Sequence, residues 1–465
     1  MIRTIIAACS LSLACVGTLF AQSKTPMKIK GNMAVVEGTV TRSYVKNVRL
    51  YKAYEGNYKE LATAILDEKG NYAFAVPDPK EGFYYVSDCM GGGKEISTRI
   101  YLKPGTSMIL NLKDDNYEMI TQSPENIALD KWQQFDAVIT KPAYQFWSDR
   151  EGYTGVFPVI EAFTPKVAAF KKQLKTKNEK FNNMMDFVVD DDVEAAAMNF
   201  LATPRVKHPD STTVFPAIYA SIKKDKKYCD ARILELGDGA RRISMYASYC
   251  QRKDKVSYKD FGYGVNLFCN DSIKGAFIVF NLRSFRTFDD LQKTVVEPYS
   301  KYLITDSMKS KVALYQKTLA TLATGEKAID FSFPDLNGKN VSMKDLKGKV
   351  VLVDVWATWC GPCRGELPHL QKLEDELKDK NIAFISMSTD IEKDKEKWKN
   401  MIAEKQMGGI QLFTNGPNNV FSEYYKVNTI PRFLVFDQEG KIVSADAPRP
   451  SEPALKDLLL KTLNK

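Results

Sequence analysis

The residues best suited to chemistry in this sequence are two cysteines, Cys360 and Cys363, with Gly-Pro between them. An apolar run at 350–355 precedes the pair and predicts a buried strand, and the pattern over 362–380 predicts a helix. Free backbone amides at a helix N-terminus stabilise negative charge, so we expect the pKa of the Cys360 thiol to be lowered. The thiolate is the attacking species in disulfide exchange, and Cys363, one turn further on, can resolve the mixed disulfide.

Other uses of two closely spaced cysteines need ligands that this sequence lacks. A zinc site needs four ligands, and the chain has no second Cys-x-x-Cys or Cys/His pair. Attachment of c-type haem needs a histidine after the second cysteine, where this chain has Arg364. The sequence therefore predicts redox chemistry by the dithiol itself, without a metal or another cofactor.

The residues around the pair, WATWCGPC over 356–363, resemble the active site of the thioredoxin family. Pro368 matches the proline that kinks the active-site helix of that family. Ile430 and Pro431 match its cis-proline loop, which lies against the dithiol and lets the preceding backbone pair with a substrate.

The segments that lead into the dithiol resemble one branch of this family. Residues 325–339 and 349–353 are similar to the TlpA/ResA-like branch of exported thiol–disulfide oxidoreductases. The resemblance covers 325–465 and implies an α/β thioredoxin-like C-terminal domain, with a mixed sheet that helices cover on both faces.

The resemblance also assigns roles to individual side chains. Asp354 lies six residues before Cys360, where thioredoxins have a buried acid, and a buried carboxylate has a raised pKa and can take the proton of the resolving thiol. Glu366 matches an acid that ResA-like proteins have near the dithiol, and a solvated helix residue is its alternative role. The resemblance further implies a redox disulfide and a set of substrate-binding residues, which are Cys360 with Cys363, and Trp359, Ile430 and Pro431.

One position departs from the family pattern. Arg432 stands after the cis-proline, where thioredoxins often have threonine. We expect a cation beside the substrate groove, which would favour acidic partners or lower the thiol pKa further.

Composition indicates a soluble, multidomain chain. The 465 residues are 44% hydrophobic and 26% charged, and their length suggests two to four domains. The net charge is +9, but 66 basic and 57 acidic residues are interspersed, which predicts a solvated surface and no nucleic-acid partner.

The first 21 residues have the features of a secretory signal: Arg3, an apolar stretch over 4–20, and a small residue, Ala21, at the cleavage site. Lipoprotein processing at Cys9 or Cys15 and an uncleaved anchor are the alternatives, and only these would tie the chain to a membrane. Each of them places the protein in the periplasm or cell envelope.

Export permits disulfides elsewhere in the chain. Four further cysteines either form bridges or remain isolated buried thiols, and their spacing leaves the pairing open: Cys89, Cys229, Cys250 and Cys269.

Two regions are expected between the signal and the thioredoxin-like domain. Residues 22–122 predict a β-sandwich-like domain, with strand candidates at 34–40, 48–54, 72–76, 83–86, 96–102 and 107–112. Residues 123–324 predict a mainly α-helical domain, with helix candidates at 125–146, 163–177, 178–189, 193–201, 214–224, 240–252, 272–284, 288–302 and 307–323. Asp191 and Glu194 form an apparent capping box before the helix at 193–201.

We therefore expect an exported thiol–disulfide oxidoreductase that mainly reduces protein disulfides of the envelope. By resemblance, its substrates are apocytochrome c thiols or other envelope disulfides. Gly-Pro between the cysteines matches thioredoxin, whose potential is about −270 mV, and reduction outside the cytoplasm needs a membrane electron donor. One alternative is a peroxiredoxin-like thiol peroxidase, although such enzymes have threonine where this chain has Ala357. The other is an envelope protein that binds a partner through its N-terminal two-thirds and has a secondary redox domain.

Overall fold

The structure is a computed structural model that describes residues 25–26, 31–88, 97–114, 116–144, 152–203, 209–210, 212–222 and 227–464. The predicted signal segment 1–21 and Cys89 lie outside the described residues. The chain forms two compact units, Met1–Phe280 and Asn281–Lys465, here called the N-terminal and C-terminal units.

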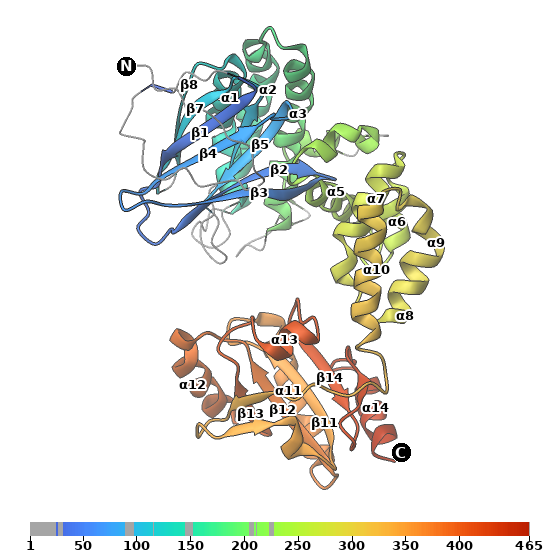
Figure 1. Cartoon of the computed structure of the whole chain (residues 1–465). Coiled ribbons are helices and arrows are strands. Elements are labelled where there is room, and N and C mark those ends of the chain that lie inside the picture. Colours follow the sequence, from blue (N-terminus) through green and yellow to red (C-terminus); the bar gives the residue numbers. More distant parts are fainter. Residues whose placement is uncertain are drawn as a thin grey trace. The chain divides into compact units, whose positions relative to one another are not determined.

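The N-terminal unit begins with two four-stranded sheets, in the strand orders β4-β1-β7-β8 and β3-β2-β5-β6 (Figure 1). Side chains from both sheets form one hydrophobic core, among them Val36, Leu50, Val86 and Leu110. Strands β3 and β8 were not predicted, because most of their side chains are exposed or half-buried and give no apolar alternation. The strands are β1 (Met33–Thr39), β2 (Asn47–Tyr54), β3 (Asn57–Ile65), β4 (Asn71–Pro77), β5 (Gly82–Ser87), β6 (Ser97–Leu102), β7 (Ser107–Leu112) and β8 (Tyr117–Thr121).

Helices make up the rest of this unit. The α-helices are α1 (Pro124–Tyr144), α2 (Tyr153–Lys171), α3 (Glu179–Ala202), α4 (Ile218–Ser221), α5 (Gly239–Lys253), α6 (Phe261–Asn266) and α7 (Asp271–Phe280). Short 3-10 helices lie at η1 (Lys172–Leu174), η2 (Lys227–Cys229) and η3 (Ala231–Glu235). None of the helices in the described parts of the chain combines the length and the apolar character that crossing a bilayer requires.

The predicted capping box at Asp191 is wrong. Helix α3 runs without a break through this position, and its N-cap is Asn178, whose side chain accepts a hydrogen bond from the Phe181 amide. Asp191 is buried in the middle of the helix and forms an ion pair with Arg242. An acid before an apolar stretch resembles a cap in sequence, but here its charge neutralises an arginine from another helix.

A buried ionic cluster joins β6, α3 and α5. Arg99 of β6 forms two hydrogen bonds with Asp192, and Arg242 of α5 pairs with Asp191 at 2.6 Å, Asp192 at 2.8 Å and Asp238 at 2.9 Å. Burial alone would raise the pKa of Asp192, but the two arginines outweigh that effect and hold it well below its usual value. The cluster therefore links one sheet of the N-terminal unit to α3 and α5 through charges that have little access to water.

Replacing Arg242 with methionine is expected to lower the free energy of unfolding of the N-terminal unit by about 3 kcal/mol, because removing one partner leaves buried carboxylates uncompensated. Arg252→Met, which changes an exposed arginine of the same helix, is the matched control. Urea denaturation followed by hydrogen exchange of the α3 and β6 amides measures the difference. Equal stability of the two variants would contradict a stabilising role for the cluster.

Cysteine pairing in this unit could not be assigned from the sequence. Cys229, at the end of η2, is bonded to Cys269, which lies just before α7, and their Cα atoms are 5.2 Å apart. Cys250 is fully buried in α5. The bridge ties two segments that are 40 residues apart in sequence.

The C-terminal unit starts with helical segments and continues with an α/β fold (Figure 1). The helical part contains η4 (Leu282–Ser284), α8 (Phe288–Leu291), a π-helix η5 (Gln292–Val296), α9 (Glu297–Tyr299), η6 (Ser300–Tyr302) and α10 (Asp306–Ala320). A hairpin of β9 (Ser332–Pro334) and β10 (Asn340–Ser342) and the short helix η7 (Met343–Leu346) follow.

A five-stranded mixed sheet forms the centre of the α/β part, in the order β13-β12-β11-β14-β15. Strands β11, β12 and β13 are parallel, whereas β14 and β15 run antiparallel to their neighbours. The elements are β11 (Val350–Trp356), α11 (Gly361–Leu377), β12 (Ile382–Ser388), η8 (Glu392–Asp394), α12 (Lys395–Lys405), β13 (Ile410–Phe413), α13 (Val420–Tyr424), β14 (Arg432–Phe436), β15 (Ile442–Ser444) and α14 (Pro453–Leu463).

Helices pack against both faces of this sheet. On one face, leucines of α11 and α14 form a core with Leu352 and Val435. On the other, Tyr425, just after α13, contacts Phe436 of β14, and Phe421 contacts Phe331. Every residue of β11 is buried, as its continuous apolar sequence predicts for a central strand. The strand therefore delivers the residues that follow it to a fixed position at the sheet edge.

Candidate active site

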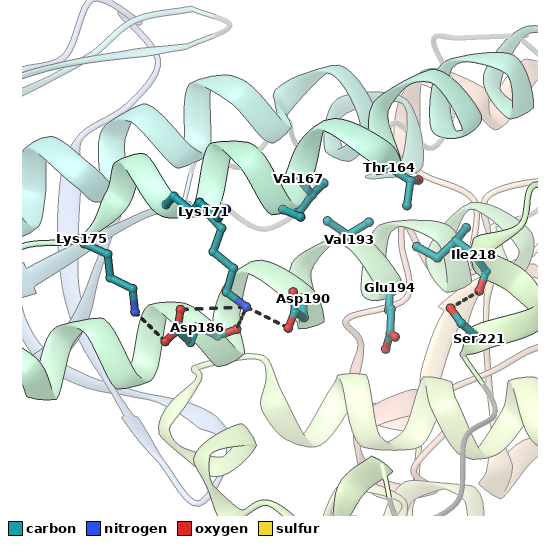
Figure 2. A pocket seen from close by; sticks show the side chains of 12 residues that line it. Thr164, Val167, Lys171, Lys175, Asp186, Asp190, Val193, Glu194, Ile218 and Ser221 are labelled. Atoms are coloured by element: carbon teal, nitrogen blue, oxygen red, sulfur yellow. Dashed lines mark hydrogen bonds and ion pairs between the residues drawn. The ribbon is translucent and has the colours of Figure 1, made fainter.

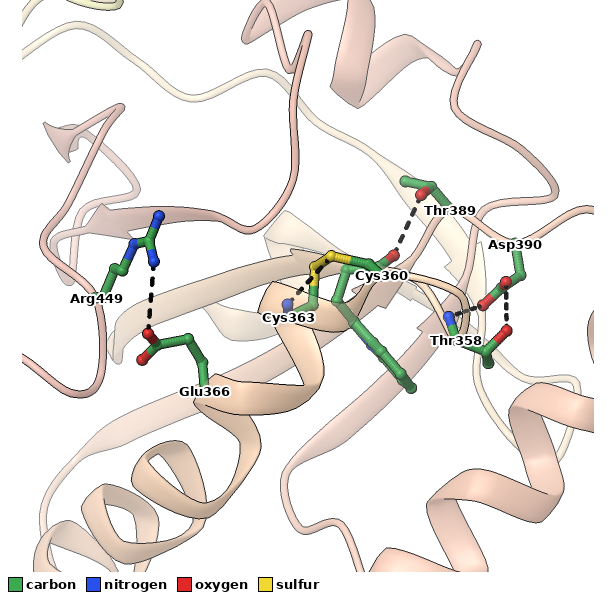
Figure 3. The surroundings of a disulfide bond; sticks show 8 residues. Thr358, Cys360, Cys363, Glu366, Thr389, Asp390 and Arg449 are labelled. Carbon is green, nitrogen blue, oxygen red and sulfur yellow. Dashed lines mark hydrogen bonds and ion pairs between the residues drawn. A yellow bond between two sulfur atoms is a disulfide. The ribbon is translucent and has the colours of Figure 1, made fainter. Parts of the chain in front are cut away.

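The two cysteines lie where β11 gives way to α11. Cys360 is the N-cap residue of the helix, and its Sγ accepts a hydrogen bond of 3.1 Å from the Cys363 amide. The two sulfur atoms form a disulfide, and the side chains are only 4% and 2% exposed (Figure 3). In the reduced protein, the same amide and the helix N-terminus would stabilise a thiolate on Cys360.

Asp354 lies on β11, six residues before the first cysteine, and is buried. Its Oδ1 atom has no hydrogen-bond partner among the described residues. Burial, and then the charges of Glu374 and Glu366, raise the pKa of Asp354 to about 8. A carboxyl group with such a pKa exchanges protons readily with a thiol.

Glu366 lies one turn after Cys363, but its carboxylate is engaged elsewhere. It accepts hydrogen bonds from the backbone N–H and the hydroxyl of Ser451, both at 3.0 Å, and Arg449 approaches it at 3.8 Å. Figure 3 shows its side chain turned toward Arg449. Glu366 therefore fastens α11 to the segment before α14, and its charge acts on Asp354 through space.

The expected substrate-binding residues are Trp359, next to the first cysteine in sequence, and the Ile430–Pro431 pair. Trp359 is 59% exposed, a large value for a tryptophan. The Ile430–Pro431 peptide is cis, as the resemblance implies. Ile430 packs against a cluster that contains both cysteines, because β14 pairs with the end of β11, with Arg432 opposite Val355. The cis-proline loop therefore packs against the cysteines, and the exposed Trp359 directly precedes Cys360 in the sequence.

Comparison with known proteins gives consistent matches to the C-terminal part. The Redoxin family matches residues 323–459. Thiol-disulfide oxidoreductase ResA of Bacillus cereus is 31% identical over 133 residues, which are 28% of this chain and 75% of that protein. Thioredoxin-like protein YneN of Bacillus subtilis is 32% identical over 128 residues, which are 28% of this chain and 74% of that protein.

The chain belongs to the ResA-like thiol–disulfide oxidoreductases. This confirms the predicted family and the thioredoxin-like fold of the C-terminal domain. Among solved structures, the thioredoxin domain of a thiol-disulfide oxidoreductase from Bacteroides vulgatus is 35% identical and covers 30% of this chain and 99% of its own, with a TM-score of 0.28. A thiol:disulfide interchange protein from a Bacteroides species is also 35% identical and covers 31% and 93%, with a TM-score of 0.28.

Sequence reasoning missed the residues that hold the active-site loop of this ResA-like protein. Asp390, two residues after β12, accepts hydrogen bonds from the Thr358 amide at 2.9 Å and the Thr358 hydroxyl at 2.8 Å (Figure 3). The amide of Thr389 also donates to the Trp356 carbonyl at 2.9 Å. These bonds fix the backbone just before Cys360. The feature of the sequence that could have identified Asp390 is an acid shortly after a buried parallel strand.

Arg432 does not play the role expected from the sequence. Its side chain is 2% exposed, its Nε donates to the Ala445 carbonyl at 2.7 Å, and it lies 3.4 Å from Asp446. Burial lowers the pKa of Arg432 to about 10. The expectation of a cation displayed beside the substrate groove is therefore wrong, because the guanidinium is used to join β14 to the segment after β15.

Arg286, from the helical segment that precedes the α/β part, reaches the cis-proline loop with its side chain. It donates to Thr429, just before that loop, at 2.6 Å and to Asp446 at 2.9 Å. Its side chain is about one-third exposed. No motif marks this arginine, and only the folded C-terminal unit brings it to the loop.

A pocket of about 590 Å³ lies in the N-terminal unit between α2 and α3. Figure 2 shows Lys171 reaching Asp186 and Asp190, with Lys175 also on Asp186. The lining contains three lysines and three acids, so their charges balance and select neither an anion nor a cation. The residues that line the pocket include no cysteine and no residue of the dithiol site.

Proposed function

We propose that this thiol–disulfide oxidoreductase is an exported reductase of protein disulfides, with Cys360 as the nucleophile. The observation that carries the proposal is the hydrogen bond from the Cys363 amide to Cys360 Sγ at a helix N-terminus. A buried carboxyl group with a raised pKa, Asp354, lies on β11, the strand that leads into this helix. This arrangement favours a thiolate on the first cysteine and offers a proton acceptor for the second.

The proposed reaction has two thiol–disulfide exchanges. The Cys360 thiolate attacks a substrate disulfide, forms a mixed disulfide and releases one substrate sulfur as a thiolate. Cys363 gives its proton to Asp354 and attacks Cys360 Sγ, so the mixed disulfide breaks and the second substrate sulfur leaves as a thiolate. Both released thiolates take protons from water. Two electrons pass from the dithiol to the substrate, and the protein ends with the Cys360–Cys363 disulfide that the structure contains.

Substrates would dock on the face formed by Trp359, Ile430 and Pro431. The exposed indole offers an apolar contact. By resemblance, the backbone before the cis peptide at Pro431 would pair with an extended segment of the substrate. Glu366 acts in this scheme as a charge near Asp354 and as an anchor for α11.

The remaining parts of the proposal concern location and supply of electrons. Residues 1–21 support export to the periplasm or cell envelope, and a lipoprotein signal or an uncleaved anchor would add membrane attachment. The oxidised dithiol would be reduced again by a membrane electron donor. The division at residues 122 and 324 into a sandwich-like and a helical domain is part of the same proposal, and these regions would recognise the partner.

Trapping of substrates tests the function. In a Cys363→Ser variant the mixed disulfide on Cys360 cannot be resolved, so envelope extracts are expected to yield covalent adducts that a reductant releases. Mass spectrometry of the released proteins identifies them and shows which of their cysteines were bound.

The matched control is the double variant Cys360→Ser/Cys363→Ser, which keeps the fold and lacks the nucleophile. Adducts that persist in the double variant would have formed on another cysteine. Absence of Cys360-dependent adducts, together with no reduction of insulin by the wild-type protein, would overturn the proposed function.

A further inference from the structure

Polar side chains form a row across the centre of the five-stranded sheet. Asp354 of β11 pairs in register with Ser386 of β12, and Ser386 pairs with Gln411 of β13. Residues that pair in register point to the same face of a parallel sheet, and this face carries α11. All three are buried, in a layer whose other strand residues are almost entirely apolar. Buried polar side chains normally have hydrogen-bond partners, so their presence in this apolar layer requires an explanation.

The row ends at a small cavity next to Glu374 of α11. The cavity lies between α11 and the sheet and is lined by Glu374, Ser386, Gln411 and Gly408, among others. Its volume of about 10 Å³ is close to the smallest space that holds one water molecule. A side chain at Gly408 would come within 2.5 Å of Glu374 Oε2, so the glycine leaves room for this carboxyl group.

Two buried oxygens along the row lack partners. Asp354 Oδ1 and Gln411 Oε1 have no hydrogen bond within the described residues, although the Gln411 amide nitrogen donates to the Gly408 carbonyl at 2.6 Å. Both side chains are more than nine-tenths buried. Unpaired acceptors at the two ends of a polar row are the expected places for a mobile proton or a bound water molecule.

Electrostatic interaction links Asp354 to Glu374, the acid beside the cavity. Burial, and then the charge of Asp375, raise the pKa of Glu374 to about 7, and the charge of Glu374 raises the pKa of Asp354 more than that of Glu366 does. The charged groups that act on the two acids are Glu366 and Asp375, both on α11. Glu374 is half-buried, so its carboxyl group can reach water on the side of the domain where α11 meets Met407 and Gly408.

We propose that Glu374 is a positioning residue that connects Asp354 to solvent from behind the dithiol, through Ser386, Gln411 and one water molecule in the cavity. This inference rests on the proposed reductase function. The proton that Cys363 gives to Asp354 leaves along this row, while the Cys363 thiolate attacks Cys360 Sγ and the substrate sulfur departs. The route matters when a protein substrate covers the dithiol, because the substrate then excludes water from the two cysteines.

Glu374→Gln in the full-length protein tests the route, and Glu376→Gln is its matched control, since Glu376 is on the same helix but pairs with Lys456. The probes are insulin, whose chains cover the dithiol, and oxidised glutathione, which is small. We expect Glu374→Gln to slow resolution of the mixed disulfide with insulin by about fivefold, a typical coupling between neighbouring residues. The reaction with glutathione should be nearly unchanged, and the pH profile of resolution should move to lower pH.

A second comparison separates the route from a merely structural effect. In an Asp354→Asn background, Glu374→Gln should have no further effect on the rate or on the pH profile, because both act on the same proton. Equal profiles for Glu374→Gln and Glu376→Gln, or additive losses in the double variant, would overturn the inference.

Failure of the proposed reductase function can be distinguished from failure of the link between Asp354 and Glu374. If the wild-type protein did not reduce insulin, the function would fail, but the ionisation of Asp354 could still be followed by NMR of a ¹³C-labelled carboxyl group. A Glu374→Gln variant with an unchanged Asp354 pKa would then refute the link between the two acids independently.

Discussion

Cys360→Ser is expected to abolish disulfide reduction, with a loss of at least about a thousandfold, the scale seen when a covalent nucleophile is removed. A serine hydroxyl at the N-cap of α11 would still accept the Cys363 amide, so the local fold should survive. It cannot replace the thiolate, because its pKa lies far above neutral pH. The measurement is the stopped-flow rate of insulin disulfide reduction by the reduced protein.

Cys363→Ser provides the contrasting result. This variant should complete the first exchange and release one substrate thiol per protein at a rate close to the wild-type value, and then stop. Quantification of the released thiol separates the two steps. If Cys360→Ser showed the single release and Cys363→Ser showed none, the assigned order of attack would be reversed.

The central part of this site could be predicted because its information is local. A continuous apolar strand, two cysteines and a helix start are consecutive in sequence, and the structure places Cys360 and Cys363 at the junction of β11 and α11. Asp354 was assigned through the family resemblance, from its spacing to Cys360, and it lies buried on the strand that leads to the dithiol.

The supporting residues could not be predicted, because only tertiary structure brings them to the site. Asp390 reaches the active-site loop from the end of β12, and Arg286 reaches the cis-proline loop from more than 140 residues upstream. Arg432 follows the cis-proline directly, yet its side chain is buried. The position of Arg432 in the sequence therefore located the cis-proline loop correctly, but it gave the wrong environment for the charge of this arginine.

Asp354→Asn is expected to slow resolution of the mixed disulfide by about a hundredfold at pH 8, because a positioned proton acceptor contributes at least that much. In the wild-type protein the rate should rise as pH approaches about 8, where the Asp354 carboxyl group loses its proton. In the variant this rise should disappear, and only the ionisation of Cys363 itself should remain. Single-turnover rates between pH 5 and 10 give both profiles.

The same substitution should make the C-terminal domain more stable. The pKa of Asp354 is about 8 in the folded protein and 3.8 in the reference state, so the folded form holds the proton more tightly. The contribution of Asp354 to stability is therefore most favourable below pH 3.8 and declines as pH rises toward 8. Asparagine removes this dependence, which corresponds to a gain of about 2–4 kcal/mol at pH 7.

Asp379→Asn, which changes an exposed aspartate just after α11, is the control for both measurements and should alter neither. A slower and more stable Asp354→Asn variant would show that the buried acid is retained for proton transfer at the expense of stability. A variant that is slower but no more stable would place the carboxyl group in contact with water in solution. A variant that is more stable but equally fast would exclude Asp354 as the proton acceptor and leave the proton of Cys363 to pass directly to solvent.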